Sequence, residues 1–302
     1  MKVHLFFHGQ LRSPTLIPVG GGTAVVFTRP SPTREDDPNE DAVGVFDLGP
    51  DAAVLAVADG VGGHGRGDEA SRVALEALAE QLDELQPEQG DLRDAVMTAI
   101  ERANTRLVAR SPSPATTLVI ATISRGLLRC YTVGDSELMV VGQRGKLKLR
   151  TIPHSPIGYA RESGLLDEAS ALMHDERHLL SNVVGMPGMH VAATTGLTLA
   201  PRDTVMLGSD GVFDNLYHDE IVQLVRAGEP YATAERVVAN LAARMAGASD
   251  DPEIPCKPDD VSFILFRTQP PTAITTRRAA EASARVDPTS VDAGAVLEPV
   301  AT

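Results

Sequence analysis

The chain has 302 residues, 43% of them hydrophobic, and carries 41 acidic against 27 basic residues, a net charge of −14. This length suits one large domain or two small ones, and the negative charge argues against a broad electrostatic grip on nucleic acid or an anionic membrane. No apolar run approaches the ~18–20 residues that a membrane span needs, and Cys130 and Cys256 lack the spacing of a metal site. We therefore expect a cytoplasmic protein with reduced thiols.

The first half of the chain contains short apolar runs and two long helical periods. Residues 1–22 are expected to form an N-terminal extension, and Val54–Ala58 has the apolar, β-branched character of a buried strand. Apolar residues at helical spacing predict two successive helices, Asp68–Leu85 and Asp91–Val108, which favours an antiparallel pair. The next predicted strands, joined by turns with glycine as in a meander, are 116–123, 127–133 and 138–141.

The second half opens with a variable stretch, and regular periods then return. After the predicted strand Thr204–Leu207, helical spacing predicts helices at Asp219–Arg226 and Tyr231–Ala246. The last predicted strand is Val261–Arg267. Because runs of strands and runs of helices are segregated along the chain, the pattern favours an α+β fold over alternating βαβ units.

Three acidic signatures stand where predicted strands end or begin. Asp59-Gly60 and Asp210-Gly211 each follow a buried strand, and the glycine lets the backbone turn sharply beside the carboxylate. Asp259-Asp260 stands just before the last strand. Each signature alone is more often an ordinary turn. Together they predict a metal site, because crowded carboxylates repel one another and hard cations such as Mg²⁺ or Mn²⁺ prefer oxygen ligands.

Two further motifs lie between these signatures, Asn39-Glu40-Asp41-Ala42 and Val133-Gly134-Asp135-Ser136. In this order, the five motifs resemble the protein phosphatase type 2C family, the metal-dependent serine/threonine phosphatases, in their bacterial form. The resemblance implies a phosphatase domain at 23–267, followed at 268–302 by a tail whose composition predicts disorder. It also implies a central β-sandwich of two antiparallel sheets flanked by antiparallel helix pairs, with a flap at about 153–180 beside the metal cleft.

The same resemblance implies roles for the acidic residues. The implied metal residues are Glu40, Asp41, Asp59, Gly60, Asp135, Asp210, Asp214 and Asp259. Asp59 would bridge two Mg²⁺ or Mn²⁺ ions, and Asp41 would lie outside the inner shell. The family pattern of Asp, then Asn or Asp, any residue, then Ser or Thr selects Asp259 rather than Asp260 as the ligand.

A weaker third metal is implied by the positions of Asp135, Asp210 and Asp214. For Asp214 the alternative is a plain position at the start of a helix, where Asp is favoured.

Some positions depart from the family pattern. The family has a phosphate-binding Arg four residues before the Glu of its Glu-Asp motif, whereas Arg34 lies six residues before Glu40, so it would contact substrate phosphate only if the loop bulges. Val61 replaces a histidine that eukaryotic members use as a proposed general acid. His64 is a loose substitute, and an exposed loop histidine without this role is the alternative. The flap carries His154, His174 and His178, which could touch substrate but by default are solvated surface residues.

Hydrolysis of a phosphate monoester needs its charge neutralised and a hydroxide made at neutral pH, which two adjacent cations provide. The resemblance therefore implies a monomeric phosphatase of phosphoserine and phosphothreonine in proteins, acting on the products of a bacterial serine/threonine kinase. Two alternatives stay open. One is a catalytically silent relative that binds phosphoproteins, suggested by the displaced Arg34 and the missing histidine. The other is a hydrolase of small phosphate esters that uses the same centre.

Overall fold

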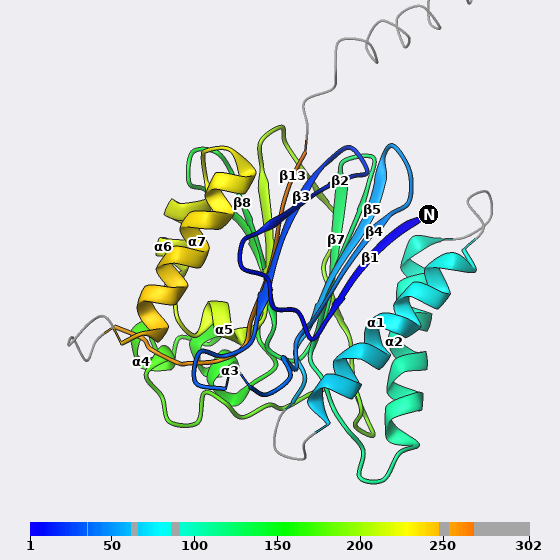
Figure 1. Ribbon diagram of the computed structural model, residues 1–302, viewed down its shortest axis with the longest axis horizontal. Helices are drawn as coiled ribbons and strands as arrows, with labels where there is room; N and C mark the ends of the chain where they lie inside the picture. The colour runs from blue at the N-terminus through cyan, green and yellow to red at the C-terminus, as the bar shows by residue number, and fades with distance from the viewer. Residues whose placement is uncertain (35, 62–65, 86–90, 248–253, 269–302) are drawn as a thin grey trace, which may run out of the picture. The chain divides into compact units, whose positions relative to one another are not determined.

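Two antiparallel sheets pack face to face in the computed structural model, which describes residues 1–34, 36–61, 66–85, 91–247 and 254–268 (Figure 1). The first sheet has the order β1 (Lys2–Phe7), β4 (Ala42–Asp47), β5 (Ala52–Ala58), β6 (Leu118–Ser124), β7 (Leu127–Val133) and β10 (Ala192–Ala193), with β11 (Leu197–Thr198) also paired to β7. The second has the order β2 (Thr15–Val19), β3 (Gly22–Arg29), β13 (Val261–Thr268), β12 (Thr204–Gly208), β8 (Glu137–Val141) and β9 (Leu147–Arg150). The expected α+β sandwich is confirmed.

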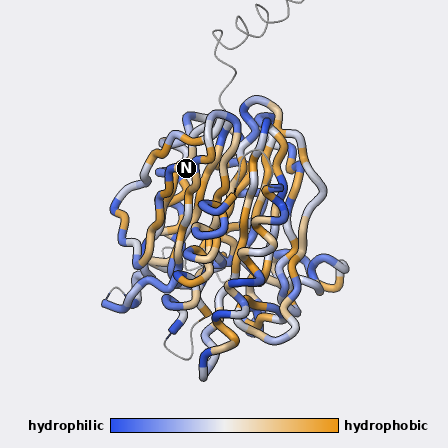
Figure 2. Tube along the Cα trace, turned by 90° about the vertical axis from the view of Figure 1, so that its right-hand side faces the viewer, coloured by the Kyte–Doolittle hydropathy of each residue, from blue (hydrophilic) through white to orange (hydrophobic). Residues whose placement is uncertain are grey.

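Strand β5 shows why the sequence is apolar without alternation in the middle of this fold. Ala53, Leu55 and Val57 belong to the core between the two sheets. Val54 and Ala56 point the other way and belong to the core between the first sheet and its helices. Because both faces of the strand are buried, neither set of side chains is polar. Figure 2 shows hydrophobic residues concentrated along the strands and hydrophilic residues in the connecting loops.

A pair of helices covers the outer face of each sheet (Figure 1). The pairs are α1 (Gly67–Asp83) with α2 (Leu92–Val108) on the first sheet, and α6 (His218–Val225) with α7 (Pro230–Met245) on the second. The ion pairs Arg102–Glu84 and Arg106–Glu80 cross between α1 and α2, so residues later in α2 meet residues earlier in α1. This confirms the predicted antiparallel pair.

The N-terminal residues form part of the two sheets. β1 pairs with β4 along its whole length, and β2 pairs with β3, so residues 1–22 form an outer strand of each sheet. This differs from the expected N-terminal extension, because the pairing partners lie in segments further along the chain. The expected tail at 269–302 lies outside the described residues.

The predicted meander is wrong at its third strand. β6 and β7 form a hairpin in the first sheet, but β8 crosses to the second sheet and pairs with β12 and β9. Gly134 makes the crossing possible, since its φ of +99° is a backbone conformation that favours glycine. A Cβ at this position would also come within 2.6 Å of the Thr117 side chain. The crossing leaves Asp135 between the two sheets.

Strand register brings the acidic motifs to one edge of the sandwich. The pairing of β4 with β5 sets Asp41 beside Asp59. β12 ends next to the first residues of β8 and β13, which sets Asp210 near Asp135 and Asp259. The short helices at this edge are α3 (Pro156–Glu162), α4 (Glu168–Leu172) and α5 (Asp210–Phe213) (Figure 1).

Candidate metal centre

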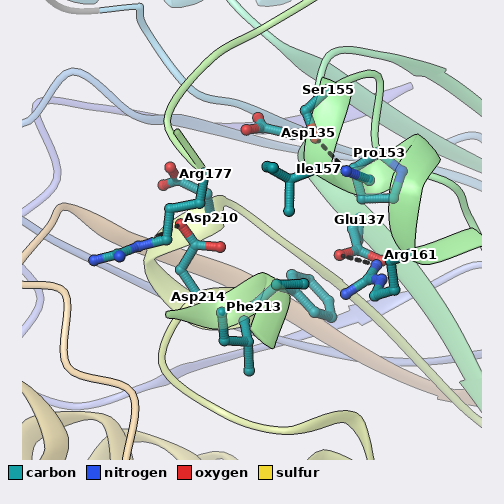
Figure 3. Close-up of a pocket in the computed structure, with 13 residues that line it drawn as sticks. Asp135, Glu137, Pro153, Ser155, Ile157, Arg161, Arg177, Asp210, Phe213 and Asp214 are labelled. Carbon is teal, nitrogen blue, oxygen red and sulfur yellow. Dashed lines mark hydrogen bonds and ion pairs between the residues drawn. The ribbon is translucent and has the colours of Figure 1, made fainter. Parts of the chain in front are cut away.

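Carboxylates from distant parts of the chain line one cleft of about 290 Å³ at this edge. The acidic residues that line it and that the sequence predicts as ligands are Glu40, Asp59, Asp135, Asp210 and Asp259, with Gly60 beside them. Asp214 lines a neighbouring pocket that shares Asp135 and Asp210. In Figure 3 the carboxylates of Asp210 and Asp214 lie close together, with Asp135 facing them. The structure thus brings together the predicted metal residues, with Asp41 buried behind the cleft.

Asp59 is held by its backbone, so its carboxylate has no role in forming the turn. Its N–H donates to Thr117 Oγ1 at 3.1 Å, and its carbonyl accepts from the Thr116 hydroxyl at 2.8 Å. The next residue, Gly60, lies so close to the backbone of Gly67 that an added Cβ would come within 2.3 Å of it. Only glycine therefore fits beside Asp59, and the turn leaves the Asp59 side chain facing the cleft.

Asp41 connects the two halves of the site from behind. Its Oδ2 accepts from Ser209 Oγ at 2.9 Å, and Ser209 directly precedes Asp210. The other oxygen, Oδ1, is buried without a hydrogen-bond partner among the described residues. Asp41 is therefore a buried carboxylate behind the cleft, and its place outside the inner shell stays a prediction.

Asp260 closes the loop that precedes Glu40. Its Oδ1 accepts from the Ser31 N–H and its Oδ2 from the Glu40 N–H, both at 2.8 Å. Because both oxygens hold backbone donors, Asp260 acts as a clamp between the two ends of this loop. The clamp also explains the reach of Arg34, which lies inside the loop.

The guanidinium of Arg34 enters the cleft despite its unusual spacing. It lies 3.3 Å from Asp259 Oδ1 and 3.7 Å from Glu40 Oε2, and the side chain is 43% exposed. Its pKa is raised, since Asp260, Asp259 and Glu40 together outweigh the effect of burial, which lowers it. The displaced arginine is therefore at the cleft.

The electrostatics of the cleft favour cations. Burial, and then the charge of Asp210, raise the pKa of Asp59 and of Asp135 well above the ordinary carboxyl range. The same causes raise the pKa of Asp259 to about 6, and burial with Asp210 raises that of Asp214 to about 6 against the opposing charge of Lys257. Carboxylate oxygens are the kind of donor that Mg²⁺ and Mn²⁺ prefer.

Lys257 is the residue of this site that the sequence reasoning missed. Its ammonium forms ion pairs with Asp210, Asp214 and Asp259. These charges outweigh burial, which lowers the pKa of Lys257, and the net result is a raised pKa. With Lys257 and Arg34 between the carboxylates, no group of three His, Cys, Asp or Glu within the described ranges is placed to hold a metal ion. A lysine two residues before Asp259 was the only available signal in the sequence.

The histidines of the flap occupy different environments. His154 differs from the solvated position expected by default: it is 4% exposed, its Nδ1 accepts from the Gly134 N–H, and burial lowers its pKa to about 4. His178 lines the cleft, whereas His174 accepts at Nδ1 from the Glu176 N–H. His64 lies outside the described residues.

A buried ionic network attaches the flap to the body of the protein. Glu137, 4% exposed at the start of β8, pairs with Arg161 of α3 at 3.4 Å. Its other oxygen lies 3.6 Å from His218 Nε2, and His218 also pairs with Glu168 of α4. Figure 3 shows the Glu137–Arg161 pair across the pocket from Asp214. The network therefore connects both flap helices to elements that carry the acidic cleft.

Comparison with known proteins agrees with this geometry. A family model described as protein phosphatase 2C matches residues 30–246. The serine/threonine phosphatase stp of Listeria monocytogenes is 28% identical over 199 residues, covering 63% of this chain and 78% of the relative.

Solved structures show the same fold. The phosphatase MsPP of Mycobacterium smegmatis, in complex with cacodylate, is 26% identical with a TM-score of 0.64, covering 81% of this chain and 97% of that chain. The catalytic domain of PstP, a phosphatase of Mycobacterium tuberculosis, was solved with two manganese ions. It is similar at 24% identity and a TM-score of 0.64, over 82% of this chain and 98% of that chain. Within the described ranges, no helix is long and apolar enough to cross a membrane.

Proposed function

Because this chain belongs to the protein phosphatase 2C family of metal-dependent serine/threonine protein phosphatases, we propose that its acidic cleft is the catalytic centre. The observation that carries the proposal is the convergence of Asp59, Asp210, Asp259 and Glu40, from four separate segments, on one cleft. Structural ion-pair networks would not require such an excess of carboxylates over cations at one point.

We assign the ligands of two divalent cations as follows. Asp59 would contact both ions, Asp210, Asp259 and the carbonyl of Gly60 would complete their inner shells, and Glu40 would act through water. When bound, Mg²⁺ or Mn²⁺ supplies charge for the phosphate oxygens and lowers the pKa of a water molecule. The backbone hydrogen bonds of Asp59 to Thr116 and Thr117 keep its carboxylate facing the cleft before any ligand arrives, which reduces the reorganisation required.

Arg34 is the proposed phosphate contact. Its guanidinium already lies at the opening of the cleft beside Glu40 and Asp259, and it is partly exposed, so it can turn from these carboxylates to a substrate anion. An Arg–phosphate contact is charge-assisted and can be bidentate. The arginine would hold the phosphate on the side away from Asp210, and the Asp260 clamp would keep it within reach.

We propose that the substrates are phosphoserine and phosphothreonine side chains of proteins modified by a bacterial serine/threonine kinase, in the cytoplasm. Support comes from the relatives, whose names describe serine/threonine phosphatases of bacteria. The protein is proposed to act as a monomer, since one chain supplies all the acidic residues of the cleft.

The test compares hydrolysis of a phosphothreonine peptide and of an aryl phosphate, with and without Mn²⁺. Turnover of both substrates only with metal is the expected result. Turnover of the aryl ester alone would contradict protein specificity and favour the small-ester hydrolase. No turnover of either substrate at saturating Mn²⁺ would favour the silent phosphoprotein-binding relative.

A further inference from the structure

The ammonium of Lys257 lies at the centre of three carboxylates. It contacts Asp210 Oδ2, lies 2.9 Å from Asp214 Oδ2 and 3.2 Å from Asp259 Oδ2, and its side chain is 16% exposed. Asp210 begins α5, Asp214 directly follows it, and Asp259 comes from the segment before β13. One lysine thus neutralises charge from two separate elements of the cleft.

Lys257 is fixed at this place by its backbone. Its N–H donates to Asn215 Oδ1 at 2.8 Å, and its carbonyl accepts from Asn215 Nδ2 at 2.9 Å. Asn215 is fully buried and also donates to the carbonyl of Gly211 in α5. The amide of Asn215 therefore attaches the lysine's backbone to the same helix that carries Asp210 and Asp214.

We propose that Lys257 is a built-in cation that replaces a third metal ion between Asp135, Asp210 and Asp214, so that this phosphatase holds two metals rather than three. The inference rests on the proposed function, because it concerns the same centre. A divalent ion bound to Asp210 and Asp214 would need the space next to their oxygens that the ammonium occupies, and two cations in contact would repel each other.

The ammonium of Lys257 pairs with one oxygen of each of three carboxylates. The described contacts of Lys257 are with the Oδ2 atoms of Asp210, Asp214 and Asp259. Asp210 also forms a side-chain hydrogen bond with Asp59. The ammonium of Lys257 is part of the chain, so its charge is present at every metal concentration. The occupancy of a weakly bound metal ion would instead depend on that concentration.

The test is the number of Mn²⁺ ions bound by the full chain, purified without metal, by isothermal titration calorimetry and by electron paramagnetic resonance of free Mn²⁺. The wild type is expected to bind two ions. Lys257→Met, which keeps most of the length of the side chain but removes its charge, is expected to bind a third, weaker ion. Lys257→Arg keeps the charge and should remain at two.

Two further variants make the result specific. Adding Asp214→Asn to Lys257→Met should remove the third ion again. Lys148→Met is the matched control, since Lys148 also pairs with a buried carboxylate, that of Asp203, but in the turn region of the second sheet. It should bind two ions.

Three ions bound by the wild type, or two bound by folded Lys257→Met, would overturn the proposal. The number of Mn²⁺ ions bound by the wild type tests the proposal even if Lys257→Met fails to fold. Failure of the proposed function is distinguishable, because it would appear as absent tight binding of two ions or absent peptide hydrolysis in the wild type itself.

Discussion

The neighbouring carboxylates at this edge differ in the hydrogen-bond partners of their oxygens. Both oxygens of Asp260 accept backbone N–H groups, so Asp260 fixes a loop. Asp59 is positioned through its backbone instead, and burial, followed by the charges of four neighbouring aspartates, raises the pKa of its carboxyl. A carboxylate saturated by backbone donors is structural, and one left facing like charges is suited to hold a cation.

Asp59→Asn should abolish Mn²⁺-dependent turnover, because it removes the charge of the only ligand proposed to touch both metals. We expect kcat/KM on a phosphothreonine peptide to fall by at least about 100-fold, since even outer partners of metal ligands are worth roughly 10–100-fold. The metal-free variant should melt no lower than the wild type, because like-charge repulsion is reduced. Circular dichroism controls for folding, and near wild-type activity at saturating Mn²⁺ would refute the bridging role.

Arg34→Ala should lower kcat/KM by roughly one to two orders of magnitude, because charge-assisted hydrogen bonds are worth about 1.5–3 kcal/mol. Affinity for Mn²⁺ should not weaken, since Arg34 supplies no ligand and its guanidinium competes for Glu40 and Asp259. Arg34→Lys retains the charge but loses the planar guanidinium, so its kcat/KM should lie between those of the wild type and Arg34→Ala. Steady-state kinetics on peptide and aryl substrates measures the effect; a change within about twofold for Arg34→Ala would show that the metals hold the phosphate alone.

At the scale of elements, a buried ionic network joins the two flap helices to the body of the protein. Glu137 on β8 is the shared acceptor of this attachment, facing Arg161 from α3, Arg150 from β9 and His218 from α6. Burial, which raises the pKa of Glu137, is outweighed by these cations, so its pKa is lowered. The position of the flap beside the cleft therefore depends on one buried carboxylate.

Glu137→Gln should destabilise the protein by about 3 kcal/mol, because it leaves buried cations without their counter-charge. At this chain length, such a loss corresponds to a fall in Tm of roughly 6–12 °C. Calorimetric melting measures the change. Glu80→Gln is the control, since Glu80 forms an exposed pair with Arg106, and it should shift the free energy of unfolding by less than about 1 kcal/mol. Equal shifts for both variants would contradict the buried network.

At the scale of the whole molecule, the two sheets end at the same edge, and each contributes acidic residues to it. Asp41 and Asp59 flank strands of the first sheet, whereas Asp210 and Asp259 flank strands of the second. Neither sheet alone could form the cleft. Metal binding should therefore couple to the stability of the whole sandwich rather than to one loop.

The metal-free protein should lose stability as the pH rises from about 4 to about 7. Burial and neighbouring charges raise the pKa of Asp214 and of Asp259 to about 6 in the folded state, above the ordinary value of about 3.9 in an unfolded chain. The folded state therefore binds more protons than the unfolded state in this window, so stability falls as these protons leave.

Mn²⁺ at about 100 times its Kd should add about 2.7 kcal/mol and raise the Tm by roughly 5–11 °C at pH 7. The rise should be smaller near pH 5, where protons compete for the same carboxylates. Thermal melting at a series of pH values, with and without Mn²⁺, checks both trends. A metal-free Tm that increases steadily from pH 5 to pH 7, or the same Mn²⁺ effect at both values, would contradict the coupling.

The sequence alone was sufficient for several strands, for the helices of both pairs and for the Asp-Gly turns, because each depends on residues close together in the chain. The apolar run before Asp59 and the helical spacing of α1 and α2 are local properties, and the structure confirms them. The preference for Asp259 over Asp260 came from the family resemblance and stays a prediction; in the structure both oxygens of Asp260 accept backbone N–H groups.

The tertiary structure decided what depends on distant partners. Lys257 meets Asp210 and Asp214 more than forty positions away, and Arg34 reaches the cleft because Asp260 holds Ser31 across 229 positions. The crossing of β8 to the second sheet also depends on distant partners, since strands can pair at any separation in the sequence. Charges and strand edges find partners through the folded backbone, so their roles follow from distances that spacing along the chain does not contain.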